Sequence, residues 1–246
     1  MLYSNFSVGG YKIIVNDDLI SFGLDNVAVA GEAAVLNLSP IAWYTSEGVV
    51  LDGSGFVENL LDVSGSGEDA VKLSGDLRVL DGVLNGYPVI ESKGYSMIAN
   101  VDTRGLDGMT VLSVINDNLI AFSNYTYVPS GGFMLYRGSI HGRPDGSGYV
   151  QTVLQSSNDY AISTAIVKDG LMSHYVNGEI VSSISIGSFK VGASKVVLFG
   201  RPYVNTNSNS GLSMGRGAEV IIFDKVLSNK ELDEVNGYLN NKYNLY

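Results

Sequence analysis

The sequence predicts an all-β protein, a two-sheet antiparallel jelly-roll sandwich that ends in one short helix. The composition favours strands and tight turns, with 30 glycines, 15 tyrosines and abundant Val, Ile and Ser. Asn-Gly and Asp-Gly pairs, the strongest short hairpin signal, recur along the chain. A clear helical period of apolar residues occurs only near the C-terminus. A dozen short strands and one terminal helix are typical of a jelly roll.

The hairpin pairs divide the chain into short strands. They stand at 52–53, 81–82, 85–86, 107–108, 145–146, 169–170 and 177–178. The clearest run is a three-stranded meander over 161–168, 171–176 and 179–186, whose turns fall at two of these pairs. Further strands are expected near 95–102, 109–115, 119–124, 132–137, 148–155, 194–200 and 217–223.

The terminal helix has its start signals written in the sequence. Ser228 and Glu231 have capping-box spacing, and Leu227 and Leu232 stand at the two positions of a hydrophobic staple. One apolar face follows at helical spacing, formed by Leu232, Val235, Leu239 and Tyr243. We therefore expect a helix that packs this face against the strands.

Length and charge exclude several classes of protein. A chain of 246 residues is long enough to form one sandwich without covalent cross-links. The absence of cysteine excludes disulfides and thiolate metal sites. A net charge of −10 without any basic run argues against nucleic acid as a partner. No signal peptide is recognised at Met1–Ser7, and no apolar stretch is long enough for membrane insertion. We expect synthesis in the cytoplasm and no membrane insertion.

Residues 1–39 are expected to form an N-terminal extension or docking arm, and residues 40–246 the sandwich domain. Two short strands are expected in the extension, at 11–15 and 26–30. The alternative is that they add a strand pair to the same sandwich.

Three segments carry a family resemblance. They are Pro40–Tyr44 followed by Asp62–Ala70, then His174–Val181, and finally the strand and helix from Gly217 to Tyr243. Together they resemble concanavalin A-like lectin/glucanase domains, in particular the laminin-G-like branch found in bacteriophage virion proteins. This resemblance implies a virion surface component, either a carbohydrate-binding or receptor-binding tail-fibre element or a capsid decoration protein. The partners it implies are other virion proteins and a host cell-surface glycan, within a homo-oligomer or a larger assembly.

We expect no enzymatic activity. Sugar-cleaving relatives use a Glu-x-Asp-x-x-Glu strand, which aims its carboxylates into one groove. Here only Glu231 and Asp233 begin such a pattern, with Asn236 in the third place, and they lie on the predicted helix. The alternatives are a purely structural decoration protein and, second, a glycoside hydrolase that lacks the usual motif.

Sugar binding needs an aromatic face beside amide, carboxylate or guanidinium groups. Two loops offer this mixture, 124–129 and 201–210, and the turn-rich loop 138–146 adds polar side chains that are free to bind a ligand. The candidate ligand-binding residues are Tyr125, Tyr127, His141, Arg143, Arg201, Tyr203, Asn205, Asn207 and Asn209. The alternative for 201–210 is a flexible polar loop that binds no ligand, and the alternative for 124–129 is that its two tyrosines pair across neighbouring strands. We expect Trp43 in the core, and His174 on a strand with an exposed or half-buried side chain.

Calcium is the candidate cofactor, because laminin-G-like relatives often hold it at the rim of the sandwich. The loops 62–69, 102–107 and 116–118 carry suitable oxygen-bearing side chains. Turn formation by the same Asp and Asn side chains is the alternative, and the sequence defines no ligand set.

Overall fold

The computed structural model describes residues 4–8, 11–16, 19–24, 31–93, 96–116, 119–123, 132–136, 139–143, 150–151, 159–187, 193–199 and 214–246. Near the N-terminus, three strands form a small antiparallel sheet: β1 (Ser4–Val8), β2 (Tyr11–Asn16) and β3 (Leu19–Leu24). The strand expected at 11–15 is therefore confirmed, whereas the one expected at 26–30 lies outside the described residues. The boundary at residue 39 stays a prediction.

All the other described strands belong to one 16-stranded antiparallel sheet. They are β4 (Ala42–Leu51), β5 (Val57–Asp62), β6 (Ala70–Ser74), β7 (Arg78–Gly82), β8 (Gly86–Lys93), β9 (Ser96–Ala99), β10 (Gly108–Asn116), β11 (Leu119–Ser123), β12 (Gly132–Tyr136), β13 (Ile140–Arg143), β14 (Val150–Gln151), β15 (Ala161–Lys168), β16 (Leu171–Val176), β17 (Glu179–Ser185), β18 (Lys195–Leu198) and β19 (Met214–Phe223).

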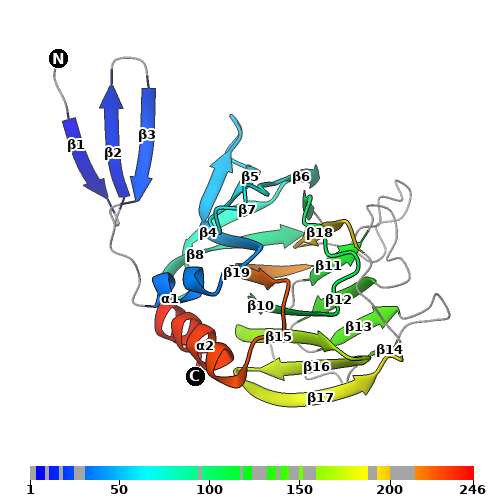
Figure 1. Cartoon of the computed structure of the whole chain (residues 1–246). Helices are drawn as coiled ribbons and strands as arrows, with labels where there is room; N and C mark the ends of the chain where they lie inside the picture. The colour runs from blue at the N-terminus through cyan, green and yellow to red at the C-terminus, as the bar shows by residue number, and fades with distance from the viewer. Residues whose placement is uncertain are drawn as a thin grey trace.

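The strand order brings together segments that are far apart in sequence. It runs β14-β13-β12-β11-β18-β9-β6-β5-β4-β19-β10-β15-β16-β17, with β8 paired to β19 and β7 to β8. The sheet folds back on itself, so that β12 lies against β15 and β13 against β16 (Figure 1). The predicted all-β, jelly-roll-like sandwich with a C-terminal helix is confirmed, and β15, β16 and β17 form the predicted meander.

Two helices cover the outer face of the sheet, α1 (Glu32–Asn37) and α2 (Asn229–Tyr243), and they pack against each other (Figure 1). The capping box of α2 is formed as predicted. The Glu231 amide donates to Ser228 Oγ at 3.3 Å, and the Ser228 amide donates to Glu231 Oε2 at 2.7 Å. No helix of the described residues is long and apolar enough to cross a membrane.

Alternation along the strands separates two cores. Tyr44 belongs to the core between the layers, whereas Trp43 belongs to the core beneath α2. Trp43 is fully buried, as predicted, and meets Tyr238 of α2 edge to face at 5.6 Å between ring centroids. The predicted apolar face of α2 is buried in the same outer core.

Three details differ from the sequence-based prediction. Helix α1 was not expected, because a helical period of apolar residues is clear only near the C-terminus. Residues 140–143 were expected in a loop but form β13, which pairs with β12. Asp107-Gly108 was expected to make a hairpin turn, but Gly108 begins β10, and a Cβ there would lie 2.6 Å from Val226 Cγ2. At Asn177-Gly178 both residues have positive φ, 52° and 82°, as a type I′ hairpin turn requires.

A buried ionic cluster fixes α2 to the sheet. Glu219 of β19 accepts hydrogen bonds from Trp43 Nε1 at 2.6 Å and from the Tyr243 hydroxyl at 2.7 Å. Lys242 Nζ lies 3.1 Å from Glu219 and 2.6 Å from Glu47. Burial lowers the pKa of Lys242, but the two carboxylates outweigh it and the pKa is raised. Lys242 therefore stays charged inside the protein.

Candidate functional site

Most of the predicted ligand-binding residues lie outside the part of the chain that the structure describes: Tyr125, Tyr127, Arg201, Tyr203, Asn205, Asn207 and Asn209. Arg143 ends β13, and His141 lies inside it rather than in a loop. His141 Nε2 lies 3.1 Å from Ser139 Oγ, and the side chain is half-buried. The role of these residues in ligand binding stays a prediction.

The Asp62–Asp69 loop is organised around one carboxylate. Both Asp62 oxygens accept hydrogen bonds from backbone amides and hydroxyls of the loop, among them Ser64 Oγ at 2.8 Å and Ser66 Oγ at 2.6 Å. The Trp43 amide donates to the same carboxylate at 2.9 Å. Burial raises the pKa of Asp62, but these hydrogen bonds outweigh it and lower the pKa overall. The carboxylate thus shapes the loop, which is the turn-forming alternative to an ion site.

In the 102–107 loop, the candidate ligand Asp102 is paired with a neighbouring arginine. Asp102 accepts from the Arg104 amide at 3.0 Å and pairs with its guanidinium at 2.6 Å, and the Arg104 hydrogen bonds lower the pKa of Asp102 to about 2. The 116–118 loop is described only at Asn116. Across the described residues, no group of three His, Asp or Glu side chains is placed to hold a metal ion.

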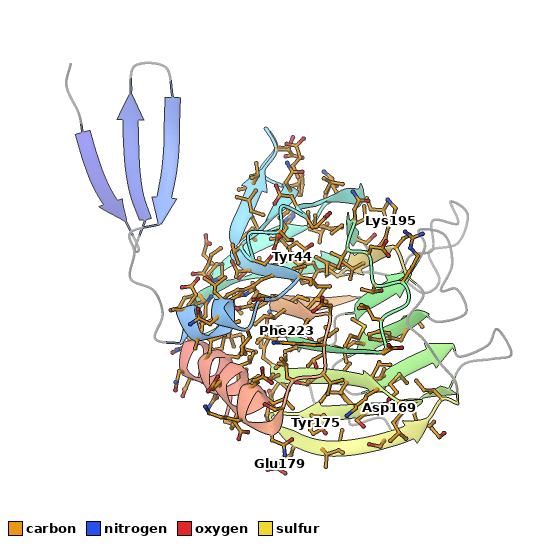
Figure 2. All side chains as sticks on the ribbon, viewed as in Figure 1. Tyr44, Asp169, Tyr175, Glu179, Lys195 and Phe223 are labelled. Atoms are coloured by element: carbon orange, nitrogen blue, oxygen red, sulfur yellow. The ribbon has the colours of Figure 1, made fainter. Side chains whose placement is uncertain are left out.

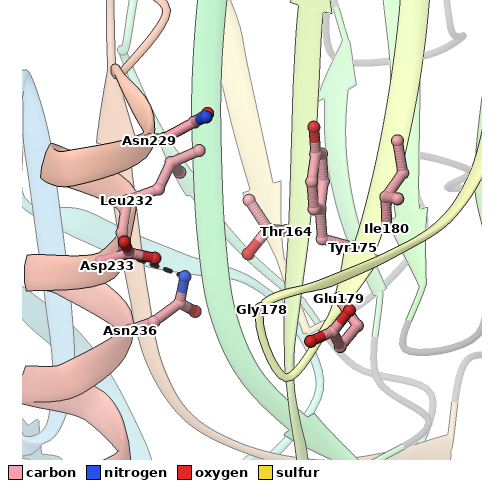
Figure 3. Close-up of a pocket in the computed structure, with 9 residues that line it drawn as sticks. All are labelled: Thr164, Tyr175, Gly178, Glu179, Ile180, Asn229, Leu232, Asp233 and Asn236. Atoms are coloured by element: carbon pink, nitrogen blue, oxygen red, sulfur yellow. Dashed lines mark hydrogen bonds between the residues drawn. The ribbon is translucent and has the colours of Figure 1, made fainter.

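A cavity of about 380 Å³ lies between α2 and the β15–β16–β17 meander (Figure 3). We call it the α2 pocket. Four helix residues form one wall and five residues of the meander form the other: Asn229, Leu232, Asp233 and Asn236 face Thr164, Tyr175, Gly178, Glu179 and Ile180. The volume is within the usual range for small-molecule sites, roughly 300–1,000 Å³.

Strand pairing and helix periodicity build this pocket. Thr164 pairs with Tyr175, and Tyr175 pairs with Ile180, so the three side chains form a row across the outer face of the sheet. The register between β16 and β17 shifts between His174 and Tyr175, and a bulge of this kind re-aims neighbouring side chains. The helix residues are spaced three or four apart, so they share one face of α2.

Two buried polar atoms of the lining have no hydrogen-bond partner among the described residues, Thr164 Oγ1 and Asn236 Oδ1. Thr164 is 1% exposed and Asn236 is 7% exposed. The Asn236 amide nitrogen already donates to the Leu232 carbonyl at 2.9 Å, which leaves its oxygen for another partner. Buried polar groups are nearly always paired, so these two atoms mark a place for a ligand or for water.

The rim of the pocket is acidic and aromatic. Glu179 and Asp233 are exposed, and Tyr175 is half-buried (Figures 2 and 3). The Tyr246 hydroxyl lies 3.9 Å from the place that a Cβ on Gly178 would take. Burial, and then the charge of Asp233, raises the pKa of Tyr246, so this phenol stays protonated and able to donate.

A second hollow, of about 440 Å³, lies on β5 and β6 and is less suited to a ligand. Its one cation, Lys72, is already paired with Asp52 at 3.2 Å and with Asp76 at 3.1 Å. Among the described atoms that line it, none is a buried polar atom without a partner. The α2 pocket is therefore the better candidate site.

The α2 pocket was not among the sites predicted from the sequence. Asn236 carried the one available signal, a polar side chain inside the apolar face formed with Leu232, Val235 and Leu239.

The prediction for His174 was wrong. Its side chain is fully buried, with Nε2 at 2.9 Å from Ser163 Oγ, because it points away from the pocket into the sandwich. Burial lowers the pKa of His174 to about 4, so the ring is neutral.

No protein-family model matches this chain, and none of the curated proteins matches its sequence. Solved structures of botulinum neurotoxin binding domains are similar to it. The serotype C1 domain has a TM-score of 0.59 and 14% identity, over 83% of this chain and 53% of that chain. The serotype D domain has a TM-score of 0.56 and 20% identity, over 83% of this chain and 52% of that chain.

A further structure is the serotype D ligand binding domain in complex with N-acetylneuraminic acid, with a TM-score of 0.55 and 20% identity over 83% of this chain and 52% of that chain. The present chain thus spans about half the length of these domains. At such low identity the likeness establishes the fold alone. The chain has an all-β sandwich fold that it shares with part of the neurotoxin binding domains.

Proposed function

We propose that this chain is a non-enzymatic carbohydrate-binding module and that the α2 pocket is its binding site. The fold likeness to binding domains supports the class, since one of them is described with N-acetylneuraminic acid and another with SialylT. Because the chain spans only about half of those domains, their ligands enter here as a guide to chemical class.

The observation that carries the proposal is the pair of unpartnered atoms Thr164 Oγ1 and Asn236 Oδ1. A buried polar group left without a hydrogen bond costs about 1–3 kcal/mol. Sugar hydroxyls both donate and accept, so one pyranose ring can satisfy the two atoms together. Tyr175 beside them offers an aromatic face for the C–H surface of the ring.

The carboxylates of the pocket argue for binding rather than hydrolysis. A glycosidase needs one carboxylic acid that stays protonated near neutral pH, and burial in apolar surroundings is the usual means. Glu179 and Asp233 are both exposed. We therefore expect no release of reducing ends when the protein is incubated with a bound glycan. Such release, lost in Glu179→Gln or Asp233→Asn, would favour the glycoside hydrolase alternative.

The biological setting rests on the sequence resemblance to laminin-G-like virion proteins. We place the chain on the surface of a bacteriophage particle, with a host cell-surface glycan as ligand. Other virion proteins would then be its neighbours, within a homo-oligomer or a larger assembly, with the segment before the sandwich as the attachment. A decoration protein without glycan binding is the alternative.

A glycan-array screen of the full chain tests the function, run with and without millimolar calcium. The variants Thr164→Val, Asn236→Leu and Tyr175→Ala remove the groups proposed to contact the sugar. Ser173→Ala is the matched control, because Ser173 lies on the same hairpin, is hydrogen-bonded to Ser183 and does not line the pocket. We expect binding that the three variants weaken at least tenfold and the control leaves unchanged.

Binding that all three variants retain would move the site away from the α2 pocket. If the folded protein binds no glycan on the array, the decoration alternative is favoured. Binding that appears only with calcium would bring an ion site back into consideration.

A further inference from the structure

The charged residues that line the α2 pocket are all acidic. Glu179 and Asp233 stand on opposite walls, and none of the nine lining residues is Lys or Arg (Figure 3). Asp233 is near enough to Tyr246 for its charge to raise the pKa of that phenol. The nearby cation Lys230 pairs with Glu234 at 3.6 Å, and neither of these two residues lines the cavity.

The start of α2, where Asn229 lines the pocket, offsets this negative charge only in part. A helix N-terminus carries a partial positive charge that attracts anions. Here the capping box uses two of the amides at that end, because Ser228 Oγ accepts a hydrogen bond from the Glu231 amide and the Glu231 carboxylate accepts one from the Ser228 amide. The pocket lies along the flank of the helix, where Leu232, Asp233 and Asn236 project.

Three groups of the lining are acceptors that have no hydrogen left to donate: the Asn236 oxygen and the carboxylates of Glu179 and Asp233. The Thr164 and Tyr175 hydroxyls and the Asn229 amide can donate as well as accept. The Asn236 oxygen has no partner among the described residues, and its amide nitrogen is already used. A ligand that pairs with these three acceptors must therefore present donors, and a cationic donor is favoured over a neutral one.

We infer that the α2 pocket selects glycans with a free amino group and discriminates against sugars that carry a carboxylate. This inference rests on the proposed function, since it names the ligand class for the same site. Two observations carry it independently, the acidic lining and the nine-tenths-buried side chains of Thr164 and Asn236 that lack partners. The preference is opposite to the anionic sugar named for one neurotoxin domain, N-acetylneuraminic acid.

The size of the preference follows from the exposure of the carboxylates. An exposed ion pair contributes up to about 1 kcal/mol, which corresponds to about fivefold in affinity. We therefore expect an ammonium-bearing sugar to bind more tightly than its N-acetylated form, by up to about fivefold for each carboxylate that it pairs with, and a sialylated sugar to bind more weakly than both. The preference should shrink as salt is raised, because exposed charges are screened.

The test uses the full chain and three probes of different charge: a glucosamine trisaccharide, the N-acetylglucosamine trisaccharide and sialyllactose. Affinities are measured by calorimetry at low and high salt for the wild type, Glu179→Gln and Asp233→Asn. Glu234→Gln is the matched control, because it removes the same charge from the same helix outside the pocket.

The inference predicts that Glu179→Gln and Asp233→Asn each reduce the amine preference severalfold, whereas Glu234→Gln leaves it unchanged. Equal affinities for the amino and N-acetyl probes would overturn it, provided that Thr164→Val still weakens both. In that case the pocket binds sugar without charge selection, and the proposed function survives. If no probe binds, or if Thr164→Val and Tyr175→Ala leave binding intact, the proposed function fails and the inference fails with it.

Discussion

Thr164 carries a hydroxyl that is buried against α2 and faces a cavity, with no hydrogen-bond partner among the described residues. A valine has nearly the same shape and would fill the same position on β15 without a polar atom. The two residues therefore differ at this site mainly in whether a polar ligand can be held. A valine at this position therefore tests whether the hydroxyl is needed for ligand binding, since the fold does not need it.

We expect Thr164→Val to raise the free energy of unfolding by about 1 kcal/mol, because it removes a desolvated hydroxyl that has no partner. The same variant should weaken glycan binding. Urea denaturation and the array measure the two effects on one protein sample. A loss of stability would mean that the hydroxyl is already satisfied in the free protein.

His174 should make stability depend on pH in a defined window. Burial lowers its pKa from the ordinary 6.5 to about 4, so the unfolded chain takes up a proton at a higher pH than the folded protein does. Stability should therefore fall as the pH drops from about 6.5 to about 4, by at most about 3 kcal/mol. Aspartates with lowered pKa values, such as Asp62 and Asp102, contribute below this window, and Glu231, whose pKa is lowered from 4.5 by hydrogen bonds from Ser228, contributes from the lower end of the window downward.

The variant His174→Gln isolates this contribution, since its amide takes the position of Nε2 beside Ser163 but does not titrate. Unfolding free energies measured every half pH unit should give a flatter profile for the variant between pH 6.5 and 4. Parallel profiles for the two proteins would show that another group is responsible.

At the scale of elements, α2 forms one wall of the proposed site, so its attachment decides whether the pocket exists. Lys242 is 4% exposed and forms ion pairs with both Glu219 and Glu47. Its ammonium group also lies 5.1 Å from the centre of the Tyr87 ring and 5.2 Å from the centre of the Tyr243 ring. Removing one partner of a buried ion pair leaves the other charge uncompensated in a dry environment.

We expect Lys242→Met to lower the free energy of unfolding by about 3–5 kcal/mol. Lys230→Met is the matched control on the same helix, because its ion pair with Glu234 is exposed and should be worth less than about 1 kcal/mol. Urea denaturation of both variants gives the comparison. Equal losses would mean that the buried cluster contributes no more than a surface pair.

The elements that the sequence predicts well are those whose signals are local. The start of α2 and the meander of β15, β16 and β17 depend on Ser228, Glu231 and turn pairs a few residues long. Strand β13 was missed because Gly142 and the neighbouring Pro144-Asp145-Gly146 are typical of a turn, whereas pairing with β12 decides the outcome.

The candidate site was not predictable in the same way. Asn236 and Thr164 are 72 positions apart in the printed sequence, and only the packing of α2 on the sheet brings them to one cavity. His174 illustrates the other limit. Alternation gives two faces to a strand, but local pattern does not say which face of β16 is buried. Met172 and His174 face the opposite layer and are fully buried, whereas Leu171 lies on the more exposed outer face.

At the scale of the whole molecule, the question is where the sandwich begins. The sequence favours residue 40, yet Val35 of α1 is fully buried in the outer core, and a Cβ on Gly31 would lie 3.2 Å from Tyr238 Cβ. The small sheet of β1, β2 and β3 shares no strand pairing with the larger sheet among the described residues.

We therefore expect a variant that starts at residue 31 to keep the unfolding free energy of the full chain. A variant that starts at residue 40 should lose about 1.5–3 kcal/mol, the contribution of a buried valine. Chemical denaturation of the two variants measures this difference. Equal stabilities would support the boundary at residue 39.

The central strands of the large sheet come from opposite ends of its sequence. Ala42 and Trp43 of β4 pair with Ile222 and Ile221 of β19, and β10 pairs with the other side of β19. While a ribosome is still adding residues before 214, β4 and β10 each wait with an unpaired edge, and open edges are templates for pairing with other chains. The sandwich can therefore close only after residues 214–223 have been synthesised, and until then the nascent chain is exposed to edge-to-edge association with other nascent chains.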